Sequence, residues 1–409
     1  MWLVRSLFWH TELLLNAAQY IAFGSAVAIL FSIAASQILL ALALVALLLS
    51  KARLRLPRIW LPLGLFLLLT LVSLAFSGDV ADGLPQVRKI YVYSMLLVVF
   101  SLFRDLRTIR WLFLAWAGVG ALVAARGNVQ FAEKVSEAAA LGRRFYDYYE
   151  PERITGFMSH WMTFSGQLMF VLLMLMAYLF WSPSARKRGL WFSLLCFGML
   201  FTGLVLGYTR NIWLATAVAG LYLIWFRRRW LVALAPVILV IGFFAAPEAL
   251  RARVTSISQA RDYRFRLLTW RTGLRMVQAH PLLGLGPEQV KLQLQQYLPP
   301  DTPRPLPDGY YGHLHNIYLQ FAAERGIPAM LILLWMLVMM ITDFAKALRG
   351  LPPGPSDRRF ILHGAIAVII ATMIAGLFEH NLGDSEVLTM FLVVAGCGYV
   401  AVEKEPDPA

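Results

Sequence analysis

The chain has 409 residues, of which 59% are hydrophobic and 15% are charged, and its formal net charge is +14. A soluble domain of this length could not cover so much apolar side chain with polar surface, so the composition excludes an ordinary soluble protein. The basic residues fall in short loops between apolar runs and form no long soluble basic face, which argues against nucleic-acid binding.

Apolar stretches recur along the whole chain at about the length of a membrane-spanning helix, roughly 17–25 residues. We expect twelve spans, at residues 17–33, 36–50, 59–77, 88–103, 109–125, 157–181, 190–206, 211–226, 230–245, 326–342, 360–378 and 386–402. The two cysteines, Cys196 and Cys397, lie inside apolar stretches, so neither a disulfide nor a zinc site is expected. The predicted fold is an all-α polytopic membrane protein, with residues 1–409 forming a single membrane domain.

The loops between these spans sort by charge. Basic clusters lie on alternate loops, within residues 51–58, 104–110, 186–188, 227–229 and 346–359. Because Lys and Arg accumulate in cytoplasmic loops, the alternation places these segments and both termini in the cytoplasm. The opposite side is expected to hold short connections such as residues 78–82, a smaller loop at 126–155, and a large helix-containing loop at 246–316 between spans nine and ten.

The large loop breaks the charge rule, because it carries eight Arg and one Lys against five acidic residues on the side that positive charge normally avoids. Its proline-rich piece, residues 299–307, should not be helical, since Pro lacks an amide donor and restricts the residue before it. This piece is a candidate flap over a site. The excess of positive charge suggests that the loop grips an anionic ligand at the membrane surface.

Four basic residues on that side are candidate ligands of such an anion: Arg88, Arg153, Arg210 and Arg266. Arg210 lies in a turn so short that it must sit at the membrane boundary. Guanidinium groups bind phosphate bidentately, so the set suits a diphosphate on a lipid carrier. A lipid-phosphate contact for Arg210 and a protein salt bridge for Arg266 stay open as alternatives.

Residues 261–279 are predicted to form a helix that ends near His280-Pro281. On a helical wheel Arg266 borders the apolar stripe, whereas Arg264, Arg271 and Arg275 cluster on another face. A charge directed at a packed face needs an anionic partner. Arg266 is therefore the stronger ligand candidate of this helix.

The large loop closes on a histidine pair with a following asparagine, His313, His315 and Asn316. A histidine near several arginines tends to stay neutral, and a neutral imidazole can accept a proton, so His315 is the candidate catalytic base. His313 and Asn316 are supporting candidates, and a helix-capping role for the histidine is the structural alternative. We expect a short helix from about residue 314 to 325, then a break before Pro328, which suits a first helical turn.

The last outward loop contains a small polar cluster, Glu379, His380, Asp384 and Glu386, which is expected to be solvated. No metal-ligand spacing, paired carboxylates or glycine-rich phosphate loop stands out. The sequence therefore predicts neither a metal nor a cofactor.

Four stretches resemble the O-antigen ligase and polymerase superfamily: RITGF at 153–157, TRNIWLA at 209–215, RLLTW at 266–270 running to HPLLGLG at 280–286, and HN at 315–316 followed by nine residues and then Gly326. Their order and the twelve-span layout match over most of the chain. Ala329 departs from the pattern, because the family often has Gly, Thr or Tyr there. That change concerns helix packing more than chemistry.

The resemblance implies a membrane-embedded glycosyltransferase of GT-C-like architecture in the bacterial inner membrane, with its active site facing the periplasm. The donor would be a glycan on undecaprenyl diphosphate and the acceptor a sugar hydroxyl of lipid A–core. Arg210 and Arg266 would bind the diphosphate and His315 would act on the acceptor hydroxyl. The compact length and single large late loop favour a ligase. A polymerase that extends a lipid-linked glycan is the alternative, and a transporter of anionic lipids or sugars is the alternative outside enzymes.

Overall fold

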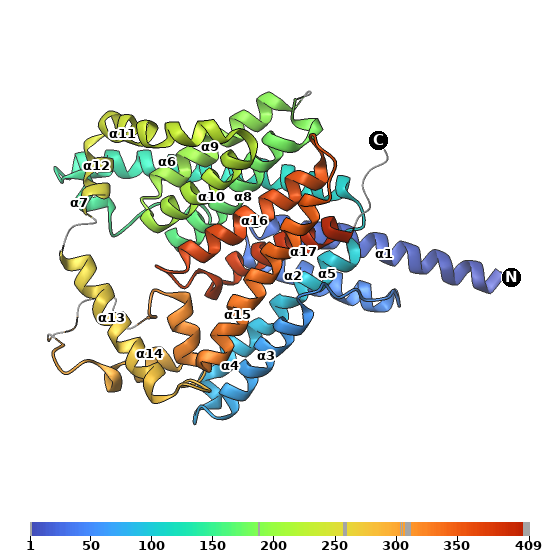
Figure 1. Cartoon of the computed structure of the whole chain (residues 1–409), viewed down its shortest axis with the longest axis horizontal. Helices are drawn as coiled ribbons and strands as arrows, with labels where there is room; N and C mark the ends of the chain where they lie inside the picture. Colours follow the sequence, from blue (N-terminus) through green and yellow to red (C-terminus); the bar gives the residue numbers. More distant parts are fainter. Residues whose placement is uncertain are drawn as a thin grey trace.

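The computed structural model describes residues 2–186, 189–256, 260–302, 304, 306 and 312–403. Regular structure in these residues is helical throughout, without a strand (Figure 1). The predicted all-α fold is confirmed. Lys187 and Arg188, part of one predicted cytoplasmic cluster, lie outside the described residues.

The helices follow the predicted apolar stretches. The first part of the chain forms α1 (Trp2–Ala28), α2 (Ile33–Leu49), α3 (Trp60–Ala75), α4 (Val80–Arg88), η1 (Lys89–Tyr93), α5 (Ser94–Leu102), α6 (Leu106–Ala140), α7 (Phe145–Tyr149), α8 (Trp161–Trp181), η2 (Pro183–Arg186) and α9 (Leu190–Leu206). The second part forms α10 (Arg210–Arg228), η3 (Arg229–Leu234), α11 (Ala235–Ala245), α12 (Glu248–Thr255), α13 (Ala260–Ala279), α14 (Gln289–Gln293), η5 (Leu294–Tyr297), α15 (Ile317–Arg349), α16 (Asp357–Ala375), η6 (Asn381–Gly383) and α17 (Ser385–Glu403).

Six helical runs in the described part of the chain are long and apolar enough to cross a membrane: Leu106–Ala140, Trp161–Trp181, Arg210–Ala245, Ile317–Arg349, Asp357–Ala375 and Ser385–Glu403. Three shorter apolar helices, α2, α3 and α9, join them. This architecture is that of a polytopic membrane protein. The number of twelve spans stays a prediction.

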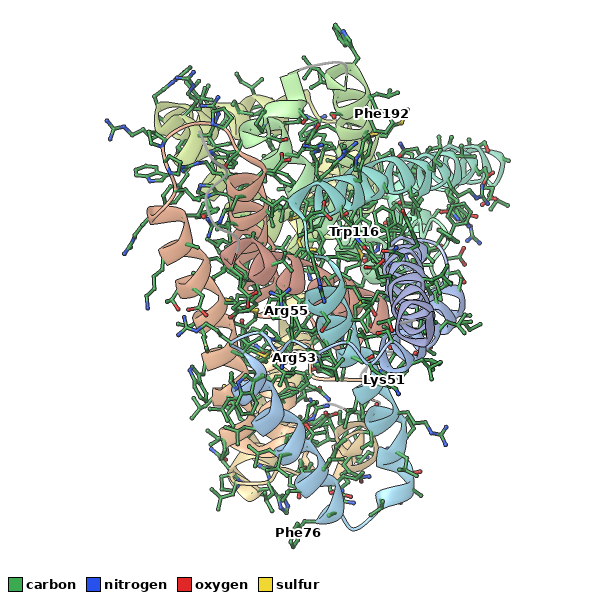
Figure 2. The ribbon with its side chains drawn as sticks, turned by 90° about the vertical axis from the view of Figure 1, so that its right-hand side faces the viewer. Lys51, Arg53, Arg55, Phe76, Trp116 and Phe192 are labelled. Atoms are coloured by element: carbon green, nitrogen blue, oxygen red, sulfur yellow. The ribbon has the colours of Figure 1, made fainter. Side chains whose placement is uncertain are left out.

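The buried centre and the surface of the bundle differ in side-chain pattern. Every residue of α8 from Thr163 to Leu175 is buried, and α16 and α17 are buried along nearly their whole length. Helices that are apolar all round belong inside a bundle or a membrane. The outer helices α3, α9 and α11 instead expose large apolar side chains, and Phe76 and Phe192 project from the surface in Figure 2. Such a surface suits contact with lipid.

The loops gather at two ends of the bundle. Three ion pairs join segments predicted to be cytoplasmic: Arg55–Glu403, Arg58–Asp343 and Arg110–Asp357. Figure 2 shows Lys51, Arg53 and Arg55 close together after α2, with Phe76 at the far end of α3. The structure therefore separates the loops into the two groups that the charge pattern predicts, while their membrane orientation stays a prediction.

The segment predicted as a loop at 126–155 is mostly helical. α6 continues past residue 125 to Ala140, and α7 follows a short turn at Gly142. The helix continues past the predicted end of the fifth span, because loss of apolar character at Arg126 does not stop a helix. The bounds of the span itself stay a prediction. The helix α6 ends just before Gly142, because a helix cannot continue through a residue with a φ of 60°.

The large loop is fastened to a break in α15. The predicted break near residues 325–328 is confirmed, since Gly326 has φ 84° and a Cβ there would lie 1.9 Å from the Leu282 carbonyl oxygen. Three backbone hydrogen bonds join the two segments: Leu285 N–H to Ala323 O (2.8 Å), Gly286 N–H to Glu324 O (2.9 Å) and Ile327 N–H to Pro281 O (2.8 Å). The end of α13 is thereby held beside the start of α15.

The proline-rich piece 299–307 is described only in part, because residues 303, 305 and 307 lie outside the described residues. Its first residues form a turn in which the Thr302 N–H donates to Pro299 O at 3.1 Å. The proposed flap stays a prediction.

Candidate active site

A cavity of about 480 Å³ lies at the end of the bundle away from the ion-paired basic loops. Its lining side chains come from segments far apart in sequence, at 86–89, 150–162, 209–211, 253, 265–266, 288–291, 312–324 and 379–384. Among them are the predicted residues Arg153, Arg210, Arg266, His313 and His315. The structure therefore brings five of the seven predicted site residues into one cavity.

Arg88 is not brought into the cavity. It is exposed at the last turn of α4, whereas the next residue, Lys89, lines the cavity and donates from Nζ to Gly383 O at 3.0 Å. Consecutive residues on a helix point about 100° apart, so one of this basic pair faces inward and the other outward. The sequence could not decide which.

Asn316 supports the site from outside the lining. Its side chain caps α15, accepting from Leu319 N–H at 2.9 Å, and its Nδ2 donates to Leu377 O at 3.1 Å. Asn is a favoured N-cap residue because its oxygen satisfies one of the amides left unpaired in the first turn. Asn316 thus ties the start of α15 to the segment that leads to Glu379.

Arginines from three elements form a basic region of the cavity. Arg153 and Arg253 both contact Glu150 Oε1, at 3.2 and 2.9 Å. Arg253 also donates to Tyr208 O at 2.9 Å. Arg210 opens α10 and donates to Ser256 Oγ at 2.8 Å. A helix N-terminus carries partial positive charge, so the backbone here adds to the attraction for an anion.

The arginines of this region affect one another's charge. Burial, followed by the nearby positive charge of Arg253, lowers the pKa of Arg153 to about 10. The Arg153 guanidinium also lies over the Trp161 ring, 4.6 Å from its centroid. An anionic ligand beside these arginines would favour their charged forms.

Arg266 reaches the cavity from α13, and its Nη1 donates to Phe378 O at 2.6 Å. Arg271, on another face of the same helix, pairs instead with the exposed Asp301 at 2.8 Å. The predicted separation of these two arginines on the helical wheel is confirmed. The side chain of Arg264 lies outside the described residues.

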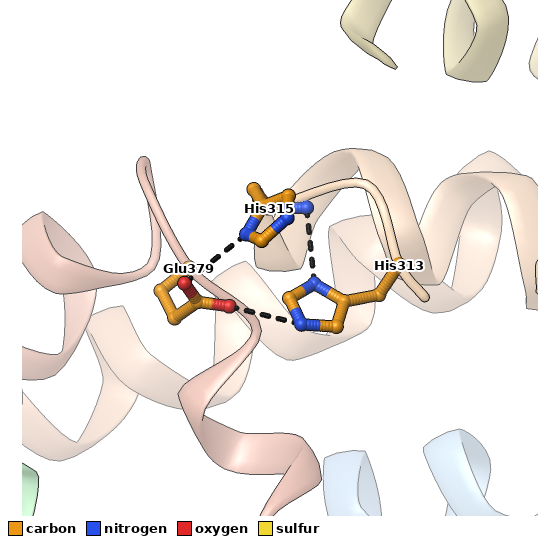
Figure 3. A group of neighbouring side chains, drawn as sticks. All are labelled: His313, His315 and Glu379. Carbon is orange, nitrogen blue, oxygen red and sulfur yellow. Dashed lines mark hydrogen bonds and ion pairs between the residues drawn. The ribbon is translucent and has the colours of Figure 1, made fainter. Parts of the chain in front are cut away.

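Beside the arginines, His313, His315 and Glu379 form a closed set of contacts (Figure 3). His313 Nε2 lies 3.2 Å from Glu379 Oε1, and His315 Nδ1 lies 3.2 Å from Glu379 Oε2. The backbone N–H of His315 donates to His313 Nδ1 at 3.2 Å. Each carboxylate oxygen therefore faces one histidine.

This pattern assigns the protons. His313 Nδ1 accepts a hydrogen bond, so in the neutral ring the proton is on Nε2, which lies 3.2 Å from Glu379 Oε1. His315 likewise carries its proton on Nδ1, next to the carboxylate, which leaves Nε2 with a lone pair. His315 is therefore held in the tautomer that can accept a proton through Nε2.

The charge states agree with this assignment. Burial alone would raise the pKa of Glu379, but the hydrogen bond from His315 and the charges of both histidines bring that pKa down to about 2. Burial, opposed in part by Glu379, lowers the pKa of His313. Glu379 is therefore anionic and His313 neutral at neutral pH.

The same three side chains form a group that could hold a metal ion. A metal bound to His313 Nε2 would move the ring proton to Nδ1, where it would oppose the His315 N–H that donates there. The observed hydrogen bonds therefore fit one ring proton on each histidine better than they fit a bound cation. The expectations of no metal and no cofactor stay predictions.

The predicted solvation of the last outward loop was wrong. Glu379 is 8% exposed and Glu386 7% exposed, and Asp384 accepts a hydrogen bond from Thr163 at 3.0 Å. Burial raises the pKa of Asp384 to about 6. The loop is buried because it is fixed between the starts of α15 and α8, a long-range contact with no local signature.

Sequence reasoning also missed Arg253 and Glu150, which complete the basic region, and His160, which lines the cavity near Arg153. Arg253 was part of the counted positive charge of the large loop but had no apolar stripe beside it to single it out. The sequence signal that could have pointed to Arg253 was the excess positive charge of the large loop.

Residues 195–334 match a family model described as O-antigen ligase. The matched segment contains Arg210, Arg266 and His315, while Arg153 and Glu379 lie outside it. A comparison with curated proteins finds no match. The family match supports the assignment of this chain to the O-antigen ligase superfamily.

Proposed function

We propose that this chain of the O-antigen ligase superfamily transfers a glycan from undecaprenyl diphosphate to a sugar hydroxyl of lipid A–core. The reaction takes place at the periplasmic face of the bacterial inner membrane. One observation carries the proposal: a glutamate-oriented histidine shares a cavity with arginines suited to a diphosphate. Glycosyl transfer from such a donor needs both a proton acceptor and an anion site.

The arginines act on the leaving group. As the bond between the anomeric carbon and the diphosphate breaks, negative charge grows on the diphosphate oxygens. Arg153, Arg210 and Arg266 are already directed into the cavity, so they stabilise that charge without reorganising. The Glu150 carboxylate contacts both Arg153 and Arg253, so the diphosphate shares these two arginines with it.

His315 acts on the acceptor. Its Nε2 takes the hydroxyl proton while the acceptor oxygen attacks the anomeric carbon. The imidazolium that forms is stabilised by the Glu379 carboxylate on Nδ1. Direct displacement of the diphosphate inverts the anomeric configuration. None of these steps uses a metal.

The acceptor separates the ligase from the polymerase, since both use the same kind of donor. The single large late loop favours the ligase. A polymerase would instead present a second lipid-linked glycan to His315.

A transfer assay with purified protein in chelator tests the proposal. The donor is a glycan on undecaprenyl diphosphate, and lipid A–core is offered as the acceptor. Glycan on lipid A–core is the expected result. Glycan that lengthens on the carrier would replace the ligase by the polymerase, and no transfer by folded protein would contradict both.

A further inference from the structure

The cavity is lined by two groups of side chains that differ in chemistry. Arginines dominate the region built by α10, α12 and the segment after α7. The other region is built by α4, α14 and the loop before α14, and it presents Gln86, Glu288 and Lys291. Figure 1 shows α7 and α12 in the upper part of the molecule and α4 and α14 in the lower part.

Glu288 has an unusual backbone. Its φ is 66°, in the left-handed region that residues other than glycine seldom adopt. Among the described residues, Lys51 (φ 52°), His315 (φ 48°) and Tyr208 (φ 49°) share this feature. His315 and Tyr208 belong to the cavity or its arginine contacts, whereas Lys51 lies in a basic loop outside the cavity lining. Strained residues of this kind cluster at functional sites, where the surrounding structure holds a side chain in place.

The surroundings fix the Glu288 carboxylate at the cavity surface. Gln86 Nε2 donates to Oε1 at 2.5 Å, and Lys291 Nζ lies 2.6 Å from Oε2. The Glu288 N–H donates to Glu324 Oε1 at 3.3 Å. Glu324 is itself buried and held by Gln320 at 2.7 Å. The side chain of Glu288 stays 16% exposed, so a ligand can reach a carboxylate that is already oriented.

This carboxylate is anionic. Burial would raise the pKa of Glu288, but hydrogen bonds from Lys291 and Gln86 lower it below the usual value. A fixed anion repels phosphate and accepts hydrogen bonds from hydroxyl groups, and an ionised carboxylate can accept about four of them. The Glu288 carboxylate itself is therefore unsuited to contact with the diphosphate and suited to contact with a sugar.

In a direct displacement the attacking oxygen approaches from the side opposite the leaving group. With the diphosphate at the arginines, the acceptor must enter from another part of the cavity, and Glu288 lines the cavity outside the arginine group. We propose that Glu288, oriented by Gln86 and Lys291, binds the acceptor sugar through its hydroxyl groups. This assignment rests on the proposed glycan transfer and adds to it the residue that recognises the acceptor.

Steady-state kinetics of Glu288→Gln test the assignment, with lipid A–core and the lipid-linked donor varied separately. The neutral amide keeps the shape of the side chain and loses the charge-assisted hydrogen bonds, so the acceptor KM should rise about 10-fold or more. The donor KM should stay within about twofold, because the arginines are unchanged. Glu133→Gln, the same substitution at an exposed carboxylate of α6 that is not part of the cavity lining, should alter neither KM.

Binding of lipid A–core without donor provides a second readout that does not need turnover. Wild type should bind it, and both Glu288→Gln and Glu288→Gly should bind it more weakly. Glycine suits the left-handed backbone, so the melting temperature of Glu288→Gly should not fall below that of Glu288→Gln. Weak binding then reflects the lost carboxylate and not a lost fold.

An unchanged acceptor KM in Glu288→Gln, or a raised donor KM with the acceptor KM unchanged, would overturn the assignment while leaving the proposed transfer intact. If wild type transfers no glycan at all, the proposed function fails by itself. In that case the binding readout still decides, because equal binding by wild type and Glu288→Gln, or none by wild type, overturns the assignment.

Discussion

At the scale of single residues, the chemistry depends on which nitrogen of His315 holds the proton. Glu379 fixes the proton on Nδ1 and thereby leaves Nε2 able to act as a base. The positive φ of His315 keeps its ring in this position at some cost in backbone strain. Base and orienting carboxylate together form a unit for proton transfer.

Replacement of His315 tests its role as the base. His315→Ala should lower the rate of glycan transfer by about 10²- to 10⁴-fold, because general-base catalysis contributes that much. Donor binding should persist, since the arginines are untouched. Single-turnover rates and donor binding measure the two effects, and transfer at the wild-type rate would remove the general-base role.

Ionisation of Glu379 should also contribute to the stability of the folded protein. Its folded-state pKa of about 2 is below the usual value of 4.5, so its contribution is fully present above about pH 4.5 and is lost as the pH falls towards 2. Wild type should therefore melt above Glu379→Gln at neutral pH, and the gap should shrink below about pH 4.5. Melting temperatures at several pH values measure it, and a gap that stays constant down to about pH 3 contradicts this pKa.

His315 was predictable from sequence because a histidine stood next to an unusually basic loop. Glu379 was not, because it is 64 residues away and its loop reads as solvated. Sequence periodicity reports on neighbours along one helix, whereas this contact arises only when α15 and α16 pack.

At the scale of elements, α13 separates a ligand-facing arginine from a solvent-facing one. Arg266→Ala should weaken donor binding by about 10- to 100-fold, the size of a lost hydrogen bond to a charged group. Arg271→Ala is the matched control and should leave donor binding unchanged, because Arg271 pairs with exposed Asp301. Donor titrations of both variants decide, and the reverse order of effects would contradict the assigned faces.

Helix positions were largely predictable because apolar runs of membrane length are strong signals. The end of α13 and the break at Gly326 followed from Pro and Gly. The end of α6 did not, since polar residues such as Arg126 continue a helix as readily as apolar ones. The hydrogen bonds that fasten the large loop to α15 join backbone groups and leave no mark in side-chain pattern.

At the scale of the whole molecule, the two groups of loops predict a membrane orientation. Arg53 lies in a basic loop expected in the cytoplasm, and Val80 lies in an acidic connection expected in the periplasm. Both are exposed, and the native Cys196 and Cys397 are buried, so a new cysteine can be labelled without background.

In intact spheroplasts, an impermeant maleimide should label Val80→Cys directly and Arg53→Cys only after the membrane is opened. Unmodified protein should stay unlabelled in both. Labelling in the reverse order would place the cavity in the cytoplasm and contradict the periplasmic active site.

The anomeric configuration of the transferred linkage tests the central claim most directly. Wild-type protein is given a donor of known configuration at the diphosphate, and the new bond on lipid A–core is assigned by NMR. Displacement of the arginine-bound diphosphate by an acceptor activated at His315 predicts the inverted configuration. A retained configuration would contradict direct displacement, and with it the roles given to His315 and the arginines.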